Sequence, residues 1–202
     1  MKQYFQQATF VQSATQASSL PPERGIEIAF AGRSNSGKSS TINKVCSQRS
    51  LARTSKTPGR TQLINFFALP DANYLVDLPG YGYAKVPLNV KMQWQQFIEA
   101  YLSTRSTLKG LILVMDIRHP LTEFDSILLN WAQYRGLAVH ILLNKTDKIS
   151  RGAAGNTLLE VRKALQQQGE QVTVQLFSAE TGQGLEQLWQ VLDRWLGKDI
   201  PI

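Results

Sequence analysis

The sequence has few residues of the types that form disulfides or zinc sites. It contains one cysteine, Cys46, and two histidines, His119 and His140, among 202 residues. This excludes an intrachain disulfide and gives no zinc-binding constellation. The longest apolar runs, such as Leu111–Met115, are far shorter than the roughly 18–20 residues that a membrane-spanning helix needs. The N-terminus lacks the continuous apolar stretch of a signal peptide. These absences predict a cytoplasmic protein with no membrane span.

Length and composition predict one folded domain. Hydrophobic residues make up 43% of the chain and charged residues 18%, as in a soluble globule with a sizeable core. Residues 1–23 are rich in Gln, Ser, Ala and Thr and contain Pro21-Pro22, so we expect a partly flexible N-terminal extension there. We expect residues 24–202 to form a single domain, and nothing in the sequence indicates more than a monomer.

Positive charge is concentrated in one stretch of the chain. The formal net charge is +7, and nearly all of the excess lies in residues 26–62. The basic residues of this stretch are Arg33, Lys38, Lys44, Arg49, Arg53, Lys56 and Arg60. Such a block indicates an anionic partner, whether a nucleotide, RNA or a membrane surface, and a solvated basic face is the alternative.

Apolar segments of strand length alternate with longer helical patterns. Six segments are typical of strands: 26–31, 64–68, 74–77, 111–116, 139–143 and 172–177. Five stretches have helical patterns: 38–48, 88–104, 122–135, 156–168 and 184–196. This alternation predicts an α/β fold with a six-stranded, mostly parallel sheet and helices on both faces. In such a sheet, functional loops gather at the carboxyl ends of the strands.

The segment Gly32-Arg-Ser-Asn-Ser-Gly-Lys-Ser39 fits the phosphate-loop pattern G-x-x-x-x-G-K-[ST]. It follows a predicted strand and precedes a predicted helix, as the pattern requires. Backbone N–H groups of such a loop surround phosphate oxygens, and the helix start adds a partial positive charge. Lys38 is then expected to reach the terminal phosphates and the Ser39 hydroxyl to bind Mg²⁺. The motif alone does not separate ATPases, kinases and GTPases.

A second motif, Asn144-Lys-Thr-Asp147, ends the predicted strand 139–143 and distinguishes these classes. A carboxylate there accepts hydrogen bonds from the ring N–H and the exocyclic amine of guanine, whereas adenine leaves Asp147 unpaired. Asn144 is placed to tie this loop to the phosphate loop, and the Lys145 stem to pack on the base. A polar turn is the alternative. A nucleoside or nucleotide kinase, which lacks such a loop, is a weaker interpretation.

Two further loops supply phosphate chemistry. Asp77-Leu-Pro-Gly80 follows a predicted strand, so that Asp77 is placed to hold Mg²⁺ through water and the Gly80 N–H to meet the γ-phosphate. The polar segment Thr54–Thr61 suits a loop that a bound ligand orders, with a plain surface loop as the alternative. Within it Thr61 is preferred over Thr57 to complete the Mg²⁺ shell.

A last loop begins at Phe177-Ser-Ala179, where the sixth predicted strand ends. The N–H groups of Ser178 and Ala179 are placed to contact the guanine carbonyl.

Taken in their order along the chain, the five elements resemble the five G motifs of translation-factor-type GTPases over residues 24–202. The elements are Gly32–Ser39, Thr61, Asp77–Gly80, Asn144–Asp147 and Ser178–Ala179. Three segments resemble the EngB family of bacterial GTP-binding proteins more closely: Gly32-Arg-Ser-Asn-Ser-Gly-Lys-Ser-Ser40, Lys56-Thr-Pro-Gly-Arg-Thr-Gln62 and Asp77-Leu-Pro-Gly-Tyr-Gly-Tyr-Ala84. The resemblance implies a P-loop NTPase G domain that acts in assembly of the large ribosomal subunit and in normal cell division and septation. It implies GTP, GDP, Mg²⁺ and the large ribosomal subunit or its precursor rRNA as partners.

The resemblance also assigns residues to the site. Nucleotide contacts fall on Gly32, Arg33, Ser34, Asn35, Ser36, Gly37, Lys38, Ser39, Ser40, Gly59, Arg60, Thr61, Gln62, Leu63, Asp77, Leu78, Pro79, Gly80, Asn144, Lys145, Thr146, Asp147, Phe177, Ser178 and Ala179. The implied catalytic residues are Lys38, Thr61, Gly80 and Asn35, and the implied metal ligands are Ser39, Thr61 and Asp77.

The residue after Gly80 departs from many regulatory GTPases, which have a water-orienting glutamine there. Here it is Tyr81, which has no amide to position water, so the resemblance implies slow intrinsic turnover with catalytic help from elsewhere. In similar GTPases an asparagine at the position of Asn35 binds K⁺ beside the phosphates. We carry this role over to Asn35, with an ordinary loop residue as the alternative. Arg33 and Arg60 are other sources of positive charge.

Two functions fit these motifs. The first is a Mg²⁺-dependent GTPase that serves as a nucleotide switch. The alternative is a binding module in which the GTP site gates docking on ribosomal RNA and hydrolysis is incidental. The basic residues that remain for RNA are Lys44, Arg49, Arg53 and Lys56.

Overall fold

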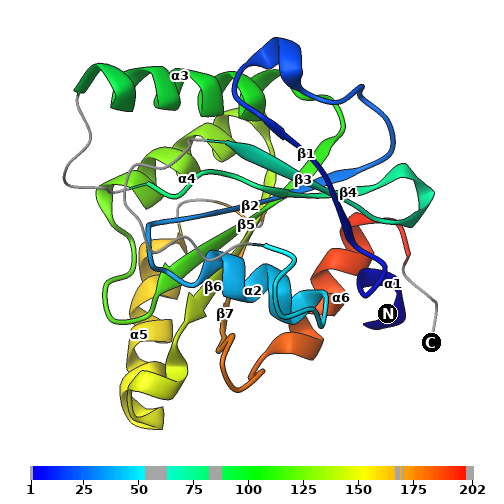
Figure 1. Ribbon diagram of the computed structural model, residues 1–202. Coiled ribbons are helices and arrows are strands. Elements are labelled where there is room, and N and C mark those ends of the chain that lie inside the picture. The colour runs from blue at the N-terminus through cyan, green and yellow to red at the C-terminus, as the bar shows by residue number, and fades with distance from the viewer. Residues whose placement is uncertain (1, 53–62, 82–87, 167–168, 170, 199–202) are drawn as a thin grey trace.

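The computed structural model describes residues 2–52, 63–81, 88–166, 169 and 171–198. Within these ranges one seven-stranded sheet crosses the molecule in the order β1-β3-β4-β2-β5-β6-β7 (Figure 1). Its strands are β1 (Thr9–Ala14), β2 (Glu27–Gly32), β3 (Ile64–Ala68), β4 (Tyr74–Asp77), β5 (Leu108–Asp116), β6 (Ala138–Asn144) and β7 (Val172–Leu176). Strands β4, β2, β5, β6 and β7 run parallel, whereas β3 is antiparallel to both of its neighbours. The predicted α/β fold with a mostly parallel sheet is confirmed.

The expectation of six strands is wrong by one, because β1 adds a seventh at the sheet edge. It pairs antiparallel with β3, from Thr9 opposite Ala68 to Ala14 opposite Ile64. An edge strand has one neighbour and a largely solvated surface, so it needs no continuous apolar run. Of the six residues of β1 only Ala14 is buried, and a register shift follows Phe10. The segment therefore lacks the pattern by which the other strands are found.

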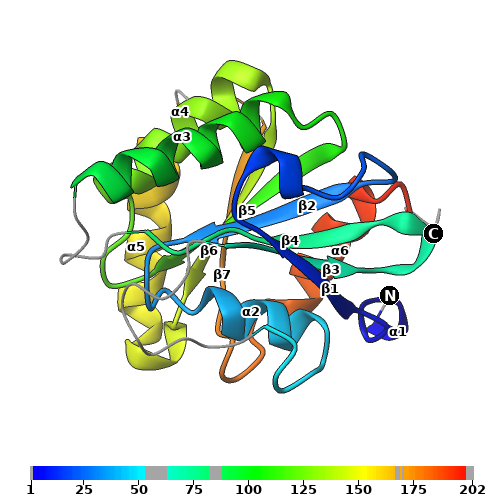
Figure 2. The same ribbon diagram turned by 45° about the horizontal axis from the view of Figure 1, so that its top comes forward.

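Six helices of the described chain cover the two faces of the sheet. They are α1 (Lys2–Phe5), α2 (Lys38–Val45), α3 (Leu88–Thr104), α4 (Glu123–Arg135), α5 (Arg151–Ala164) and α6 (Leu185–Trp195). Helices α3, α4 and α5 pack on one face, and α1, α2 and α6 pack on the other, as Figures 1 and 2 show. The described residues contain no helix that is both long and apolar enough to cross a membrane.

Helix α5 begins at Arg151 rather than near residue 156. Ser150 caps it, since the Ser150 hydroxyl accepts a hydrogen bond from the Ala153 N–H at 3.2 Å. The first turns contain Gly152 and Gly155, which lower the helix propensity. Because these turns also lack spaced large apolar residues, the hydrophobic pattern does not indicate where the helix begins. The cap supplies a partner for one of the free N–H groups of the first turn.

The central strands are buried on both faces, which explains their continuous apolar runs. Every residue of β2 is buried, and its alternate side chains enter the two cores on either side of the sheet. Because β4, β2, β5, β6 and β7 are parallel, their carboxyl ends lie along one edge. The described motif residues lie at the ends of four of these strands, β2, β4, β6 and β7, so the fold brings the predicted motifs together.

Candidate nucleotide-binding site

The phosphate loop connects β2 to α2 and requires glycine at both of its ends. Gly37 has a φ of 96°, and a Cβ there would lie 2.2 Å from the Asn144 side-chain nitrogen. A Cβ at Gly32 would lie 2.6 Å from the Val114 carbonyl oxygen and from the Ser36 hydroxyl. Helix α2 then begins at Lys38, and its first N–H groups have no intrahelical partners. The loop therefore presents backbone donors and a helix N-terminus, the elements that bind phosphate.

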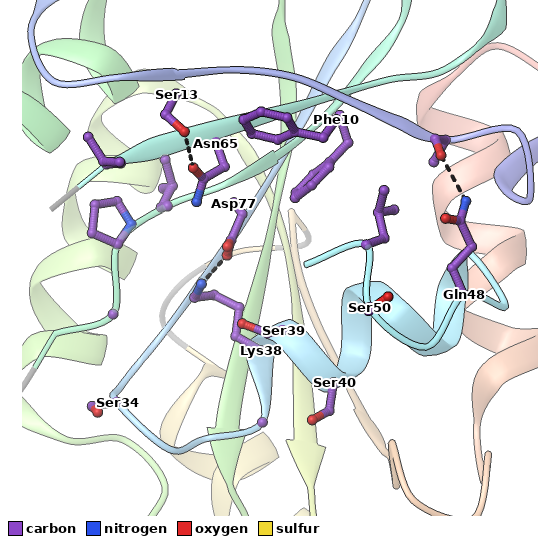
Figure 3. A pocket seen from close by; sticks show the side chains of 18 of the residues that line it. Phe10, Ser13, Ser34, Lys38, Ser39, Ser40, Gln48, Ser50, Asn65 and Asp77 are labelled. Atoms are coloured by element: carbon purple, nitrogen blue, oxygen red, sulfur yellow. Dashed lines mark hydrogen bonds and ion pairs between the residues drawn. The ribbon is translucent and has the colours of Figure 1, made fainter. Parts of the chain in front are cut away.

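A cavity of about 1100 Å³ opens beside this loop (Figure 3). Many predicted contact residues line it: Arg33, Ser34, Asn35, Gly37, Lys38, Ser39, Ser40, Leu63, Asp77, Leu78, Pro79, Gly80 and Lys145. The cavity extends to β1 and β3, where Phe10, Ser13 and Asn65 contribute side chains that the sequence did not indicate. The predicted residues Gly59, Arg60, Thr61 and Gln62 lie outside the described residues.

Lys38 and Asp77 face one another across this cavity. The Lys38 ammonium contacts the Asp77 carboxylate, and both side chains are at least nine-tenths buried. Each charge thus has an opposite charge beside it in the protein interior. Ser39 lines the same cavity, so that its hydroxyl and the Asp77 carboxylate both provide oxygen donors there. Oxygen donors of this kind are the ligands that Mg²⁺ prefers, so the residues present fit a magnesium ion.

Asn144 joins three loops of the site. Its side-chain nitrogen donates to the Ser36 carbonyl at 2.8 Å, and its side-chain oxygen accepts from the Ala179 N–H at 3.0 Å. Asn144 is 1% exposed, so both hydrogen bonds are shielded from water. The predicted tie between the Asn144 loop and the phosphate loop is confirmed. The structure adds the tie to the Ser178–Ala179 loop.

The loop that carries Asp147 is fixed by the loop after β7. The Ser178 hydroxyl donates to one Asp147 carboxylate oxygen at 2.6 Å, which lowers the pKa of Asp147 and keeps it ionised at neutral pH. Thr146 donates from its hydroxyl to the Phe177 carbonyl at 3.0 Å. The Phe177 ring is fully buried, so this residue acts through its backbone. Gln183 also contacts the Thr146 hydroxyl, at 2.8 Å, and was not predicted.

Lys145 reaches from the same loop to the phosphate loop. Its backbone has a φ of 70°, and its ammonium donates to the Asn35 carbonyl and, at 2.9 Å, to the Asp116 carboxylate. Partial burial raises the pKa of Asp116, but hydrogen bonds from Arg118 and Lys145 outweigh this effect and hold that pKa well below its usual range. Asp116 is a site residue that the sequence reasoning missed. The one feature of the sequence that could have indicated it is a carboxylate at the end of a buried strand.

Tyr81 is buried against α4. Its hydroxyl contacts the Asp125 carboxylate, and its ring stacks on Phe124 with centroids 5.6 Å apart. Burial, and then the charge of Asp125, raise the pKa of Tyr81 well above its usual value, so the hydroxyl stays protonated. The Tyr81 carbonyl meanwhile accepts from the Ser34 N–H at 2.7 Å. The residue therefore contributes backbone to the phosphate loop and a side chain to the core.

A phosphate loop and an Asn-Lys-x-Asp loop, joined at the carboxyl ends of parallel strands, define a P-loop GTPase domain. Residues 27–145, more than half of the chain, match the 50S ribosome-binding GTPase family. The protein belongs to this family, which implies that it binds and hydrolyses GTP.

Solved structures share this fold. A probable GTP-binding protein EngB is 21% identical with a TM-score of 0.69, and the match covers 85% of this chain and 99% of that one. A bacterial selenocysteine-specific elongation factor, EF-Sec, is 22% identical with a TM-score of 0.62, covering 88% of this chain and 29% of the factor. Era, solved with MgGDPNP and a 16S ribosomal RNA fragment, is 18% identical with a TM-score of 0.62, covering 89% of this chain and 59% of Era. At these identities the likeness shows the fold.

Proposed function

We propose that the protein is an EngB-type GTPase, a nucleotide switch that acts in assembly of the large ribosomal subunit and is needed for normal cell division. The observation that carries the proposal is the joining of the phosphate loop to the Asn144–Asp147 loop through the buried Asn144 amide. The family description, a GTPase that binds the 50S ribosome, supports the ribosomal role. The match to nearly the whole length of a probable GTP-binding protein EngB supports the EngB type.

The phosphate end of the site gathers Lys38, Ser39 and Asp77 at one cavity. Lys38 would contact the terminal phosphates of the nucleotide, and the Asp77 carboxylate and the Ser39 hydroxyl would hold the metal. Mg²⁺, when bound, neutralises charge on the β- and γ-phosphates. Backbone N–H groups of residues 37–40 at the start of α2 and of Gly80 complete the contacts to phosphate. The remaining predicted ligand, Thr61, is proposed from the sequence alone.

The base end of the site selects guanine through Asp147. The Ser178 hydroxyl fixes the orientation of the Asp147 carboxylate, whose oxygens accept from the two neighbouring N–H donors of guanine. Adenine has no such pair of donors, so its binding would leave the carboxylate unpaired. The Lys145 stem and the N–H groups of the Ser178–Ala179 loop supply the other contacts to the base.

Turnover without a partner is slow because Tyr81 cannot orient water. Its side chain is 3% exposed and is directed to Asp125 rather than to the phosphate cavity. Lys38, Gly80 and Thr61 then stabilise the transition state by charge and position alone. Asn35 is exposed at the cavity and is proposed to bind K⁺ beside the phosphates. GTP hydrolysis should therefore be faster in K⁺ than in Na⁺.

Ribosome docking is tested by co-sedimentation with large ribosomal subunits. We expect the protein to pellet with them in a non-hydrolysable GTP analogue and to stay in solution with GDP. Asp147→Asn exchanges an acceptor for a donor, so docking of this variant should respond to xanthine rather than guanine nucleotides. Equal pelleting in both nucleotide states would reject a nucleotide switch. A different result would favour the RNA-binding module instead. In that result docking depends on the bound nucleotide, but neither K⁺ nor ribosomal precursors change the rate of GTP hydrolysis.

A further inference from the structure

Strand β5 lies between the two strands that lead into the nucleotide loops. The phosphate loop follows β2, the Asn144–Asp147 loop follows β6, and β5 pairs with both strands. Asp116 is the last residue of β5 and lies opposite Asn144 in the ladder. The Ile117 N–H donates to the Asn144 carbonyl at 2.9 Å, so the pairing continues to the edge of the site. The Asp116 carboxylate is thereby placed between the phosphate loop and the base loop.

The Asp116 carboxylate accepts hydrogen bonds from Arg118 and from Lys145. Arg118 donates to it from the backbone N–H at 3.1 Å and from the guanidinium at 2.9 and 2.6 Å. The oxygen at 2.6 Å from Arg118 also accepts from the Lys145 ammonium at 2.9 Å. Lys145 in turn donates to the Asn35 carbonyl in the phosphate loop. A continuous chain of contacts thus runs from Arg118 through Asp116 and Lys145 to Asn35.

We propose that Asp116 is a positioning residue for nucleotide binding that acts through the Lys145 ammonium. This inference rests on the proposed function, because it assumes that the Lys145 stem packs on the guanine base. With its ammonium anchored at Asp116 and at Asn35, the stem is held in place between the phosphate loop and the Asn144–Asp147 loop. Ordering a lysine side chain at the moment of binding costs conformational entropy, and the anchored side chain avoids that cost.

Asp116 should affect the affinity for nucleotide but neither the selectivity for guanine nor the rate of hydrolysis. Asp116 contacts Lys145 but no group placed at the reacting phosphate, so its loss should change nucleotide release and leave turnover at saturating GTP unchanged. Discrimination between guanine and adenine belongs to Asp147 and should be retained. The effect of Asp116 should also vanish when the Lys145 ammonium is absent, because the carboxylate then has nothing to position.

The test is a double-mutant cycle on the dissociation rate of fluorescent GDP from the full-length protein. Asp116→Asn keeps the shape and removes the charge, and we expect GDP to dissociate about tenfold faster. Lys145→Met keeps the stem and removes the ammonium. In that background Asp116→Asn should change the rate by less than about twofold, since contacting residues act as one unit. Asp71→Asn, in an exposed ion pair with Lys198 at 2.8 Å, is the matched control and should leave the rate unchanged.

Two results would overturn the inference. One is that Asp116→Asn leaves the GDP dissociation rate unchanged. The other is that Asp116→Asn accelerates GDP dissociation by the same factor in the Lys145→Met background as in the wild type. If Asp116→Asn does not fold, Asp116→Glu keeps the charge but displaces the carboxylate by one methylene group. It should accelerate release in the wild-type background and not in Lys145→Met. Failure of the proposed function looks different, because wild-type protein would then bind no guanine nucleotide.

Discussion

The Tyr81 side chain packs in the core beside the nucleotide site rather than facing the phosphate cavity. It directly follows Gly80, where a side chain can face the phosphates, yet its ring packs on Phe124 and its hydroxyl contacts Asp125. Asp125 in turn accepts from the Thr122 N–H and hydroxyl, both at 2.7 Å, and so closes the N-terminal cap of α4. The aromatic side chain is therefore part of the packing between the Asp77–Gly80 loop and α4.

Tyr81→Phe should separate this structural role from catalysis. The variant keeps the ring and removes one hydrogen bond to the buried Asp125 carboxylate, which should lower the free energy of unfolding by about 1–3 kcal/mol. Single-turnover GTP hydrolysis should stay within about twofold of wild type, because the hydroxyl does not face the phosphate cavity. Urea unfolding and single-turnover assays measure the two effects. A large loss of turnover with unchanged stability would instead place the Tyr81 hydroxyl in the chemistry of hydrolysis.

His140 is a second residue whose surroundings decide its behaviour. Its ring nitrogens lie 2.7 Å from the Thr173 hydroxyl and 2.8 Å from the Gln175 side-chain oxygen on β7. Burial lowers its pKa, and this effect outweighs the hydrogen bond to Gln175, which raises the pKa. The folded protein therefore binds a proton at His140 less readily than the unfolded chain, whose histidines titrate near about 6.5.

Folding stability should consequently fall as the pH drops below that value. The unfolded state binds the extra proton there, so His140 contributes a slope of up to about 1.4 kcal/mol per pH unit until its folded-state pKa is reached. His140→Gln carries no titrating group and should lose less stability than wild type between pH 7.5 and pH 5.5. Urea unfolding at both pH values measures this difference. Parallel losses in the two proteins would show that other groups cause the dependence.

At the scale of elements, a buried charge cluster joins four segments at the end of β2 opposite the phosphate loop. Glu27 accepts from the Arg105 guanidinium at 2.6 and 2.9 Å, from the Tyr101 hydroxyl at 2.7 Å and from the Thr107 hydroxyl at 2.9 Å. Arg105 also donates to the Pro21 carbonyl at 2.7 Å. The cluster ties the C-terminal end of α3, the start of β5 and the N-terminal segment to β2.

Arg105→Met should be strongly destabilising, because it leaves the fully buried Glu27 carboxylate without its cation. The expected loss is about 3–5 kcal/mol in the free energy of unfolding. Adding Glu27→Gln should recover part of this loss, since the neutral amide still accepts from Tyr101 and Thr107. Urea unfolding of both variants provides the comparison. A loss below about 1 kcal/mol for the single variant would mean that the cluster does not hold these elements together.

The sequence predicted the elements that have an apolar run or a helical spacing of apolar residues, and it missed β1 and the start of α5, which have neither. Strands such as β5 and β6, buried on both faces, have apolar runs that identify them without a structure. Strand β1 is an edge strand that mixes polar and apolar residues without alternation, and the start of α5 is marked by Ser150 and two glycines rather than by apolar spacing. In both places solvent exposure removes the hydrophobic signal.

The site was predictable where a motif fixes the chemistry and unpredictable where only tertiary contacts do. Gly37, Lys38 and Asn144 occupy places that their motifs require. Asp116 and Gln183 belong to no motif, and they reach the site because β5 ends between two loops and because the loop after β7 folds back. Spacing in the sequence does not encode such contacts.

At the scale of the whole molecule, the concentrated positive charge divides between the site and the surface. Lys38 is buried against Asp77, and Lys44 donates to the Glu180 carbonyl at 3.0 Å. Arg33 and Arg49 are exposed and available to an anionic partner. The remaining basic residues of this stretch, Arg53, Lys56 and Arg60, lie outside the described residues. Contacts of basic side chains with RNA release counterions, so the proposed docking on ribosomal RNA should weaken as salt increases.

We expect the nucleotide site of this fold to be selective for guanine. The most direct test is displacement of fluorescent GDP from the wild-type protein by unlabelled GTP and by ATP in the presence of Mg²⁺. GTP should displace the probe at micromolar concentrations, and ATP should fail at millimolar concentrations, because adenine leaves the Asp147 carboxylate unpaired. Displacement by ATP and GTP at similar concentrations would contradict the account.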